Sequence, residues 1–146
     1  MTSSSAAESQ LLRANPYFLV NDVFTSAEYY RDVLGFHFHQ FWGEPPSFVM
    51  VIRDGVQIML CQSDDRSARN IVRPNRAVLP YSFDAYIYVK DADALHAEFE
   101  SRGAKLLGEP QDQPHDCREF DVEDLNGYVL RFGQDMLANS SLKEST

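Results

Sequence analysis

Two small groups of histidine and cysteine side chains are the first places to look for chemistry in this chain. His37 and His39 alternate in an aromatic segment, so on an extended chain both point to one side, and a His-x-His pair can hold a metal ion. His115, Asp116 and Cys117 form the second group. Neither group is completed by a further ligand at a spacing typical of a metal site, and the commoner interpretation is polar side chains on a cavity wall or in solvent. We therefore predict no metal site and no catalytic residue in either group.

The remaining candidate residues do not add a catalytic set. His96 falls in the middle of an expected helix, where we expect it to be exposed. Cys61 and Cys117 lack CxxC spacing and fit a reducing cytoplasm. The sequence shows no serine–histidine–aspartate motif and no glycine-rich phosphate loop. These residues point to no reaction class, and we predict no cofactor.

Length and composition favour a folded, acidic protein. The chain has 146 residues, of which 44% are apolar and 12% aromatic, and this is enough for a packed core. Its formal net charge of −9 disfavours nucleic acid and anionic membrane surfaces as partners, and is explained either by solubility or by a cationic partner. No apolar run reaches membrane-spanning length and the polar N-terminal stretch does not resemble a secretory signal, so we expect a cytoplasmic protein.

The segment 84–132 shows most clearly which elements would position side chains. Alternating residues at 86–89 predict a strand, Asp91 or Asp93 is placed to cap the helix that follows, and Gly103 ends that helix. A short strand, a charged strand and a closing strand at 128–132 follow. The predicted order is therefore strand, helix and three strands.

The first half of the chain repeats this order. We predict a strand at 15–21, a helix at 22–34 and strands at 36–42, 48–53 and 56–62. The two halves share a Val-x-Asp before the helix, a glycine after it, and an Asp-Gly or Asn-Gly turn before the last strand. Neither half could bury a sheet face alone. We therefore predict an α+β fold in which two pseudo-symmetric βαβββ modules form one curved mixed β-sheet cup with the helices outside.

The expected boundaries follow from this repeat. They are a tail at 1–13, a first module at 14–62, a linker at 63–82, a second module at 83–134 and a C-terminal tail at 135–146. The linker carries Arg66, Arg69, Arg73 and Arg76 among acidic residues and prolines. Mixed charge runs of this kind are more often solvated than functional.

The motifs at the first helix and in the last two strands resemble one known superfamily. The first is Val-x-Asp followed by Tyr-Tyr-Arg-Asp-Val-Leu-Gly-Phe at 29–36, and the second is Arg-Glu-Phe at 118–120 followed by Asp-Leu-Asn-Gly-Tyr-Val-Leu-Arg-Phe-Gly at 124–133. These are similar to the vicinal oxygen chelate superfamily, which includes glyoxalase I, extradiol dioxygenases, fosfomycin-modifying enzymes and bleomycin resistance proteins. Leu125 replaces the proline usual in its second motif. The resemblance covers about 15–133.

The resemblance implies four metal-ligand positions, which can be examined one at a time. Enzymes of this superfamily mostly hold a divalent ion with His and Glu side chains on four strands, and the matching positions here are Asn15, Met59, Asp84 and Arg131. Only Asp84 suits a hard or borderline cation, because Met is too soft, Asn is marginal and a guanidinium repels the ion. We predict that the metal site is lost, and that Asp84 and Arg131 pair with each other across it.

Strand alternation then predicts which residues line the cup. The lining would be rich in aromatic groups, suited to stacking on planar or cationic ligands, although some of these rings could equally belong to the core. The predicted ligand-binding residues are Tyr17, Leu19, His37, His39, Phe41, Met59, Cys61, Asp84, Tyr86, Tyr88 and Arg131.

The resemblance and the residues together favour a binding protein of the bleomycin-resistance type. It would be a metal-free homodimer that sequesters a small aromatic or cationic molecule, such as a glycopeptide antibiotic. The alternative is a metal-dependent lyase, isomerase or dioxygenase with displaced ligands drawn from His37, His39, Asp84 or Glu119. A metal-free acid–base enzyme is a third hypothesis, but the sequence shows no poised acid–base pair for it.

Overall fold

The computed structural model describes residues 8–62 and 72–137. Residues 8–13 have no helix or strand, whereas residues 1–7, most of the predicted linker (63–71) and residues 138–146 lie outside the described part. The elements of the first half are β1 (Tyr17–Val20), α2 (Val23–Asp32), β2 (Phe41–Trp42), β3 (Phe48–Arg53) and β4 (Val56–Gln62). Those of the second are the 3-10 turn η2 (Asn75–Ala77), β5 (Ala85–Tyr88), α3 (Ala92–Ser101), β6 (Lys105–Leu106), β7 (Gln111–Asp112), β8 (Cys117–Glu123) and β9 (Val129–Asp135).

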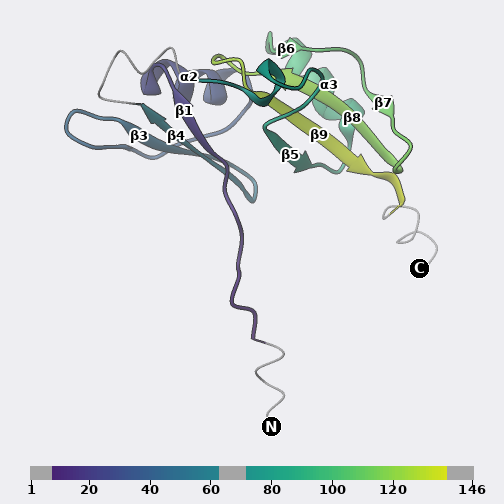
Figure 1. The fold of residues 1–146 in the computed structure, drawn as a ribbon, viewed down its shortest axis with the longest axis horizontal. Helices are drawn as coiled ribbons and strands as arrows, with labels where there is room; N and C mark the ends of the chain where they lie inside the picture. The colour runs from purple at the N-terminus through teal and green to yellow at the C-terminus, as the bar shows by residue number, and fades with distance from the viewer. Residues whose placement is uncertain (1–7, 63–71, 138–146) are drawn as a thin grey trace.

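The two halves repeat the same topology, and they lie beside each other in Figure 1. In the first, the strand order is β1-β4-β3-β2, with β1 parallel to β4. In the second it is β5-β9-β8-β6, with β5 parallel to β9 and β7 as an additional short partner of β8. This confirms the α+β class with mixed sheets. The described strands are hydrogen-bonded into two sheets, one in each half, with no ladder between them.

Both helices begin at aspartates, and of the two candidate caps of the second helix Asp91 is the one that caps it. The Asp22 carboxylate accepts from the backbone N–H groups of Phe24 and Thr25, and the Asp91 carboxylate accepts from that of Ala94. These bonds satisfy N–H groups that have no partner within the helix itself. Neither helix in the described residues has the length and hydrophobicity that crossing a membrane requires.

The predicted strand at 36–42 is largely wrong. Only β2 is formed there, together with a single bridge between His37 and Ile52. The backbone after α2 turns at Gly35, and the N–H of Phe36 still donates to the carbonyl of Tyr30. Regular pairing with β3 therefore begins only at Phe41.

His96 is buried, contrary to expectation. It lies on the inner side of α3 with 6% of its surface exposed, and its ring packs edge-on against Phe120 at 5.1 Å. Its Nε2 is 3.0 Å from the carbonyl oxygen of Gly108 and 3.2 Å from a carboxylate oxygen of Glu109. His96 therefore ties α3 to the loop that leads into β7.

One hydrophobic core is shared by the two halves. It contains the helix-facing residues of both sheets together with the inner faces of α2 and α3. Phe18 of β1 stacks on Tyr128 at 4.4 Å between ring centroids, and the Tyr128 hydroxyl donates to the carbonyl of Leu19 at 2.7 Å. The Tyr30 hydroxyl of α2 donates to the buried carboxylate of Asp124 at 2.8 Å. The face of each sheet opposite the helices therefore points away from this core. It is the face that the sequence predicts to line the cup, and it is called the outer face below.

Candidate functional site

The outer face of the first sheet carries an exposed apolar surface. Residues paired across neighbouring strands share a face. The pairings Tyr17–Met59–Met50 and Leu19–Cys61–Phe48–Trp42 therefore place these side chains together on the outer face. Tyr17, Leu19 and Trp42 are 55%, 42% and 56% exposed, which is unusual for side chains of this size. Four of the predicted lining residues, Tyr17, Leu19, Met59 and Cys61, therefore lie together.

Phe41 does not belong to this surface, so its predicted position is wrong. It pairs with the buried Val49, and its ring packs on Phe24 of α2 at 4.6 Å and on Phe38 at 5.2 Å. The register slips by one residue between the His37–Ile52 bridge and the Phe41–Val49 pair. A one-residue slip moves a side chain to the other face of a strand.

His37 and His39 are exposed at the edge of the first sheet. Their rings are 5.4 Å apart, edge to face. His37 lies opposite Ile52, and this pairing places it on the outer face as predicted. Within the described part of the chain, neither imidazole belongs to a group of three potential metal ligands.

The outer face of the second sheet is polar and tightly paired. Arg131 donates from Nε and Nη2 to the two carboxylate oxygens of Asp121 at 2.7 and 2.9 Å, and its guanidinium lies over the Phe83 ring at 4.6 Å. The hydrogen bond to Asp121 raises the pKa of Arg131 further. Arg131 Nε is 4.0 Å from a carboxylate oxygen of Glu119, which is 7% exposed. A bidentate pair of this kind fixes the position of the guanidinium.

Tyr86 and Tyr88 form the aromatic side of the same face. The Tyr86 hydroxyl donates to Oε2 of Glu119 at 2.5 Å, and the two tyrosine rings are 4.9 Å apart. Burial, followed by the hydrogen bond to Glu119, raises the pKa of Tyr86, so its proton stays on the phenol. Gly133 faces this contact, because a Cβ there would clash with the Tyr86 hydroxyl and ring. The absence of a side chain at Gly133 lets Tyr86 reach Glu119.

Asp84 is occupied by backbone groups, and its predicted pairing with Arg131 is wrong. One carboxylate oxygen accepts from the N–H of Asn75 and the other from the N–H of Val129, both at 2.8 Å. Arg131 pairs with Asp121 instead. Asp84 therefore fastens the η2 turn to the start of β9.

The four positions implied by the resemblance do not fit a divalent ion. The carboxylate of Asp84 is engaged by two amides, and a guanidinium held by Asp121 stands at Arg131. Met59 offers a thioether, and the Asn15 amide is bonded to Gln57 at 3.5 Å. A cation at these positions would meet a positive charge and too few oxygen or imidazole ligands.

Glu119 and Asp121 are the residues that strand alternation could have assigned to the site. Both alternate with the buried Phe120 and Val122 along β8, so they face outward beside Arg131. They border a hollow of about 330 Å³ that Tyr81 and Arg131 also line. Glu119 enters the sequence analysis only as a candidate displaced metal ligand, and neither residue belongs to the predicted lining.

A larger groove of about 640 Å³ lies at the junction of the halves, away from this chemistry. It runs between the β3–β4 turn and α3, and among the predicted residues only Tyr88 borders it. Arg53 crosses it to bind Glu98 through two hydrogen bonds of 2.9 Å, and this ion pair lowers the pKa of Glu98. The groove is therefore spanned by a structural ion pair.

The two outer faces belong to two different sheets. Among the described residues, no hydrogen bond, ion pair or ring contact joins the Tyr17–Met59 surface to the Tyr86–Arg131 surface. Within the chain, the two halves share the core that contains both helices.

Comparison with known proteins places this geometry in a family. A family model for the Glyoxalase/Bleomycin resistance protein/Dioxygenase superfamily matches residues 13–132, and no curated protein matches the chain. The bleomycin-binding protein of Streptomyces verticillus, solved with copper(II)-bleomycin, is 22% identical with a TM-score of 0.63, over 86% of this chain and 97% of that one. The bleomycin resistance determinant of transposon Tn5 is 16% identical with a TM-score of 0.66, over 86% and 98%.

A third similar structure extends the match along the chain. The glyoxalase/bleomycin resistance protein/dioxygenase from Nocardioides is 16% identical with a TM-score of 0.63, over 92% of this chain and 89% of that one. At these identities the similarity shows the fold alone. Because the family model spans most of the sequence, this chain belongs to the Glyoxalase/Bleomycin resistance protein/Dioxygenase superfamily.

Proposed function

We propose that this protein is a cytoplasmic binding protein that sequesters a small aromatic or cationic molecule, such as a glycopeptide antibiotic, without transforming it. The observation that carries the proposal is the pair of outer faces. One presents exposed aromatic side chains and the other presents tyrosines beside a fixed group of charges. Stacking on rings and pairing with carboxylates are the interactions that hold planar cations.

The state of the superfamily metal positions supports binding over metal-dependent catalysis there. Arg131 and Asp84 are both held in pairings that leave no open ligand set. This also weighs against the alternative of a lyase, isomerase or dioxygenase that uses Asp84 with displaced ligands.

We further propose that the ligand site is completed by a homodimer. Two copies could place the first outer face of one protomer against the second outer face of its partner. Tyr17, Leu19 and Trp42 are large, exposed and adjacent, and such a surface is typical of an interface or a ligand site.

Analytical ultracentrifugation should show a dimer at micromolar concentration.

Calorimetric titration with bleomycin tests the function. We expect saturable heat at micromolar concentration, and about 3- to 10-fold weaker binding in each of the variants Tyr17→Ala and Tyr88→Ala, because each loses one stacking surface. Both side chains are more than half exposed, so the variants should fold normally.

Phe24→Ala is the matched control. Phe24 is an aromatic residue of similar exposure on α2, on the side away from both outer faces. The Phe24→Ala variant should bind bleomycin as tightly as the wild-type protein does. Absence of heat with folded wild-type protein would reject bleomycin as the ligand, and equal loss in Phe24→Ala would reject the outer faces as the site.

A further inference from the structure

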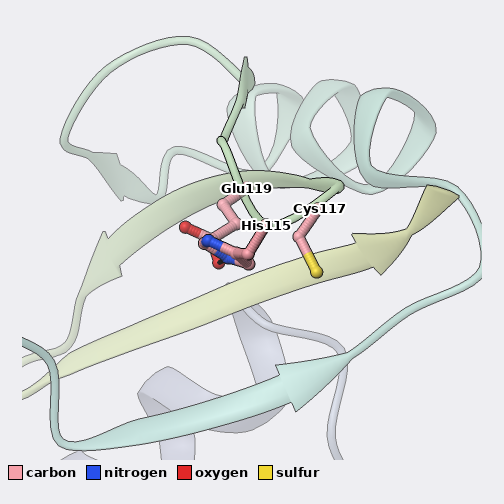
Figure 2. Close-up of side chains that lie close together, drawn as sticks. All are labelled: His115, Cys117 and Glu119. Atoms are coloured by element: carbon pink, nitrogen blue, oxygen red, sulfur yellow. Dashed lines mark hydrogen bonds and ion pairs between the residues drawn. The ribbon is translucent and has the colours of Figure 1, made fainter. Parts of the chain in front are cut away.

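We propose that His115, Cys117 and Glu119 form a site for a divalent transition-metal ion, Zn²⁺ in the first place. Figure 2 shows the three side chains close together at the start of β8. One donor atom from each, an imidazole nitrogen, a thiol sulfur and a carboxylate oxygen, lie within 4.8 Å of one another. This trio differs from the four superfamily positions examined above and shares no residue with them.

Local backbone geometry brings the three side chains together. Cys117 and Glu119 are two residues apart on β8, so they point to the same face. On an extended chain, His115 would lie about 13 Å from Glu119. Instead, Asp116 adopts a left-handed φ of 62°, and the N–H of Gln113 donates to the carbonyl of Cys117 at 2.8 Å. This tight turn folds His115 back over the strand, with Nε2 at 3.0 Å from Oε2 of Glu119.

The donor set suits zinc. Zn²⁺ accepts nitrogen, sulfur and oxygen ligands at about 2.0–2.3 Å, so ligand atoms in a tetrahedral site lie about 3.4–3.8 Å apart. The three donor atoms lie within 4.8 Å of one another, so movements of about 1 Å would bring them to the separations of a tetrahedral site. His115 is 58% exposed and free to make such a movement, whereas Cys117 and Glu119 are nearly buried and already placed.

The surroundings hold the buried carboxylate in position. The Tyr86 hydroxyl donates to Glu119, and the Tyr86 ring has room to do so because Gly133 has no side chain. The Arg131 guanidinium is 4.0 Å from Glu119 but is paired with Asp121. Hydrogen bonds of this kind to a metal-ligating carboxylate orient it and strengthen binding.

Three protein ligands leave a fourth position of a tetrahedral ion open. His115 is the exposed member, so the open position faces solvent over β8. Sites with three protein ligands and an open position take a water or an external donor group as the fourth ligand. The trio is therefore suited to an exchangeable ion rather than to a closed structural one.

Cobalt(II) titration of the full-length, chelator-stripped and reduced protein tests the site. We expect one equivalent to bind with a thiolate-to-cobalt absorption band in the near ultraviolet and with visible bands of a four-coordinate ion, and one equivalent of Zn²⁺ to displace it. Cys117→Ser should lose the thiolate band. His115→Gln and Glu119→Gln should weaken binding on the order of 100-fold.

Two variants with the same chemistry elsewhere serve as controls. Cys61→Ser and His39→Gln remove a thiol and an imidazole in the first half of the chain and should leave the titration unchanged. Because His115 is exposed, His115→Gln remains informative even if a variant at a buried position unfolds. The proposal is overturned if the wild type shows no thiolate band, if Cys61→Ser rather than Cys117→Ser abolishes it, or if His115→Gln binds as the wild type does. Bleomycin binding is measured separately by calorimetry, so failure of the metal site and failure of the proposed function give distinguishable results.

Discussion

Replacing Asp124 with alanine should lower the free energy of unfolding by about 3 kcal/mol, since it leaves several buried donors unpaired. The Asp124 carboxylate accepts from the Tyr30 hydroxyl at 2.8 Å and from the backbone N–H groups of Asn126 and Tyr128 at 2.9 Å. Asp124 is 3% exposed and Tyr30 is fully buried, so water cannot replace these bonds. Chemical denaturation measures the effect. Asp93→Ala, which removes an exposed carboxylate bound to Arg118, should cost less than about 1 kcal/mol.

The same carboxyl group should make stability depend on pH in a defined direction. Burial raises the pKa of Asp124 from 3.8 to about 6. The folded state therefore holds this proton more tightly than the unfolded chain, so the contribution of the group is complete below about pH 4 and is lost as the pH rises through 6. Between pH 4 and pH 7 the wild type should lose up to about 3 kcal/mol relative to Asp124→Asn, which does not titrate. Parallel pH profiles for the two proteins would contradict this assignment.

Replacing Arg131 with methionine should destabilise the protein by about 2–3 kcal/mol at neutral pH. The change removes two hydrogen bonds to Asp121 and leaves the Asp121 and Glu119 carboxylates facing each other without a cation. Like charges in a partly buried site raise each other's pKa. The folded variant should therefore take up protons as the pH falls, and its deficit should shrink between pH 7 and pH 5. Thermal or urea unfolding at several pH values measures both effects.

Arg118→Met is the matched control for this prediction. Arg118 also bridges two carboxylates, those of Asp93 and Asp112, but both partners are largely exposed. Its loss should cost less than about 1 kcal/mol. The double variant Arg131→Met/Asp121→Leu should recover part of the stability, because it removes the stranded charge along with its partner. If Arg118→Met lowers the free energy of unfolding as much as Arg131→Met does, burial of the Arg131–Asp121 pair adds nothing to stability.

The sequence predicts the repeated topology well because its signals are local. Asp22 and Asp91 cap helices through groups two or three residues away, and strand alternation places Tyr17, Met59, Tyr86 and Arg131 on outer faces. The periodicities of strands and helices depend only on a short stretch of sequence. They can therefore be recognised without knowing which segments pack against it.

The failures have non-local causes. Phe41 changes face because one residue is inserted between two pairings with β3. Asp84 binds Asn75, which lies in the connection between the halves, and His96 is covered by the loop at Gly108. In each case a contact with a distant segment decides the outcome, and residue spacing alone does not show it.

The stacking of Phe18 on Tyr128 and the bond from Tyr30 to Asp124 should make melting an all-or-none event for the described fold. Neither half can open without exposing the apolar interior of the other, so intermediates with one half intact should be scarce. Scanning calorimetry should therefore give one peak whose van't Hoff and calorimetric enthalpies agree. A chain cut between the halves should not yield two fragments that each retain structure.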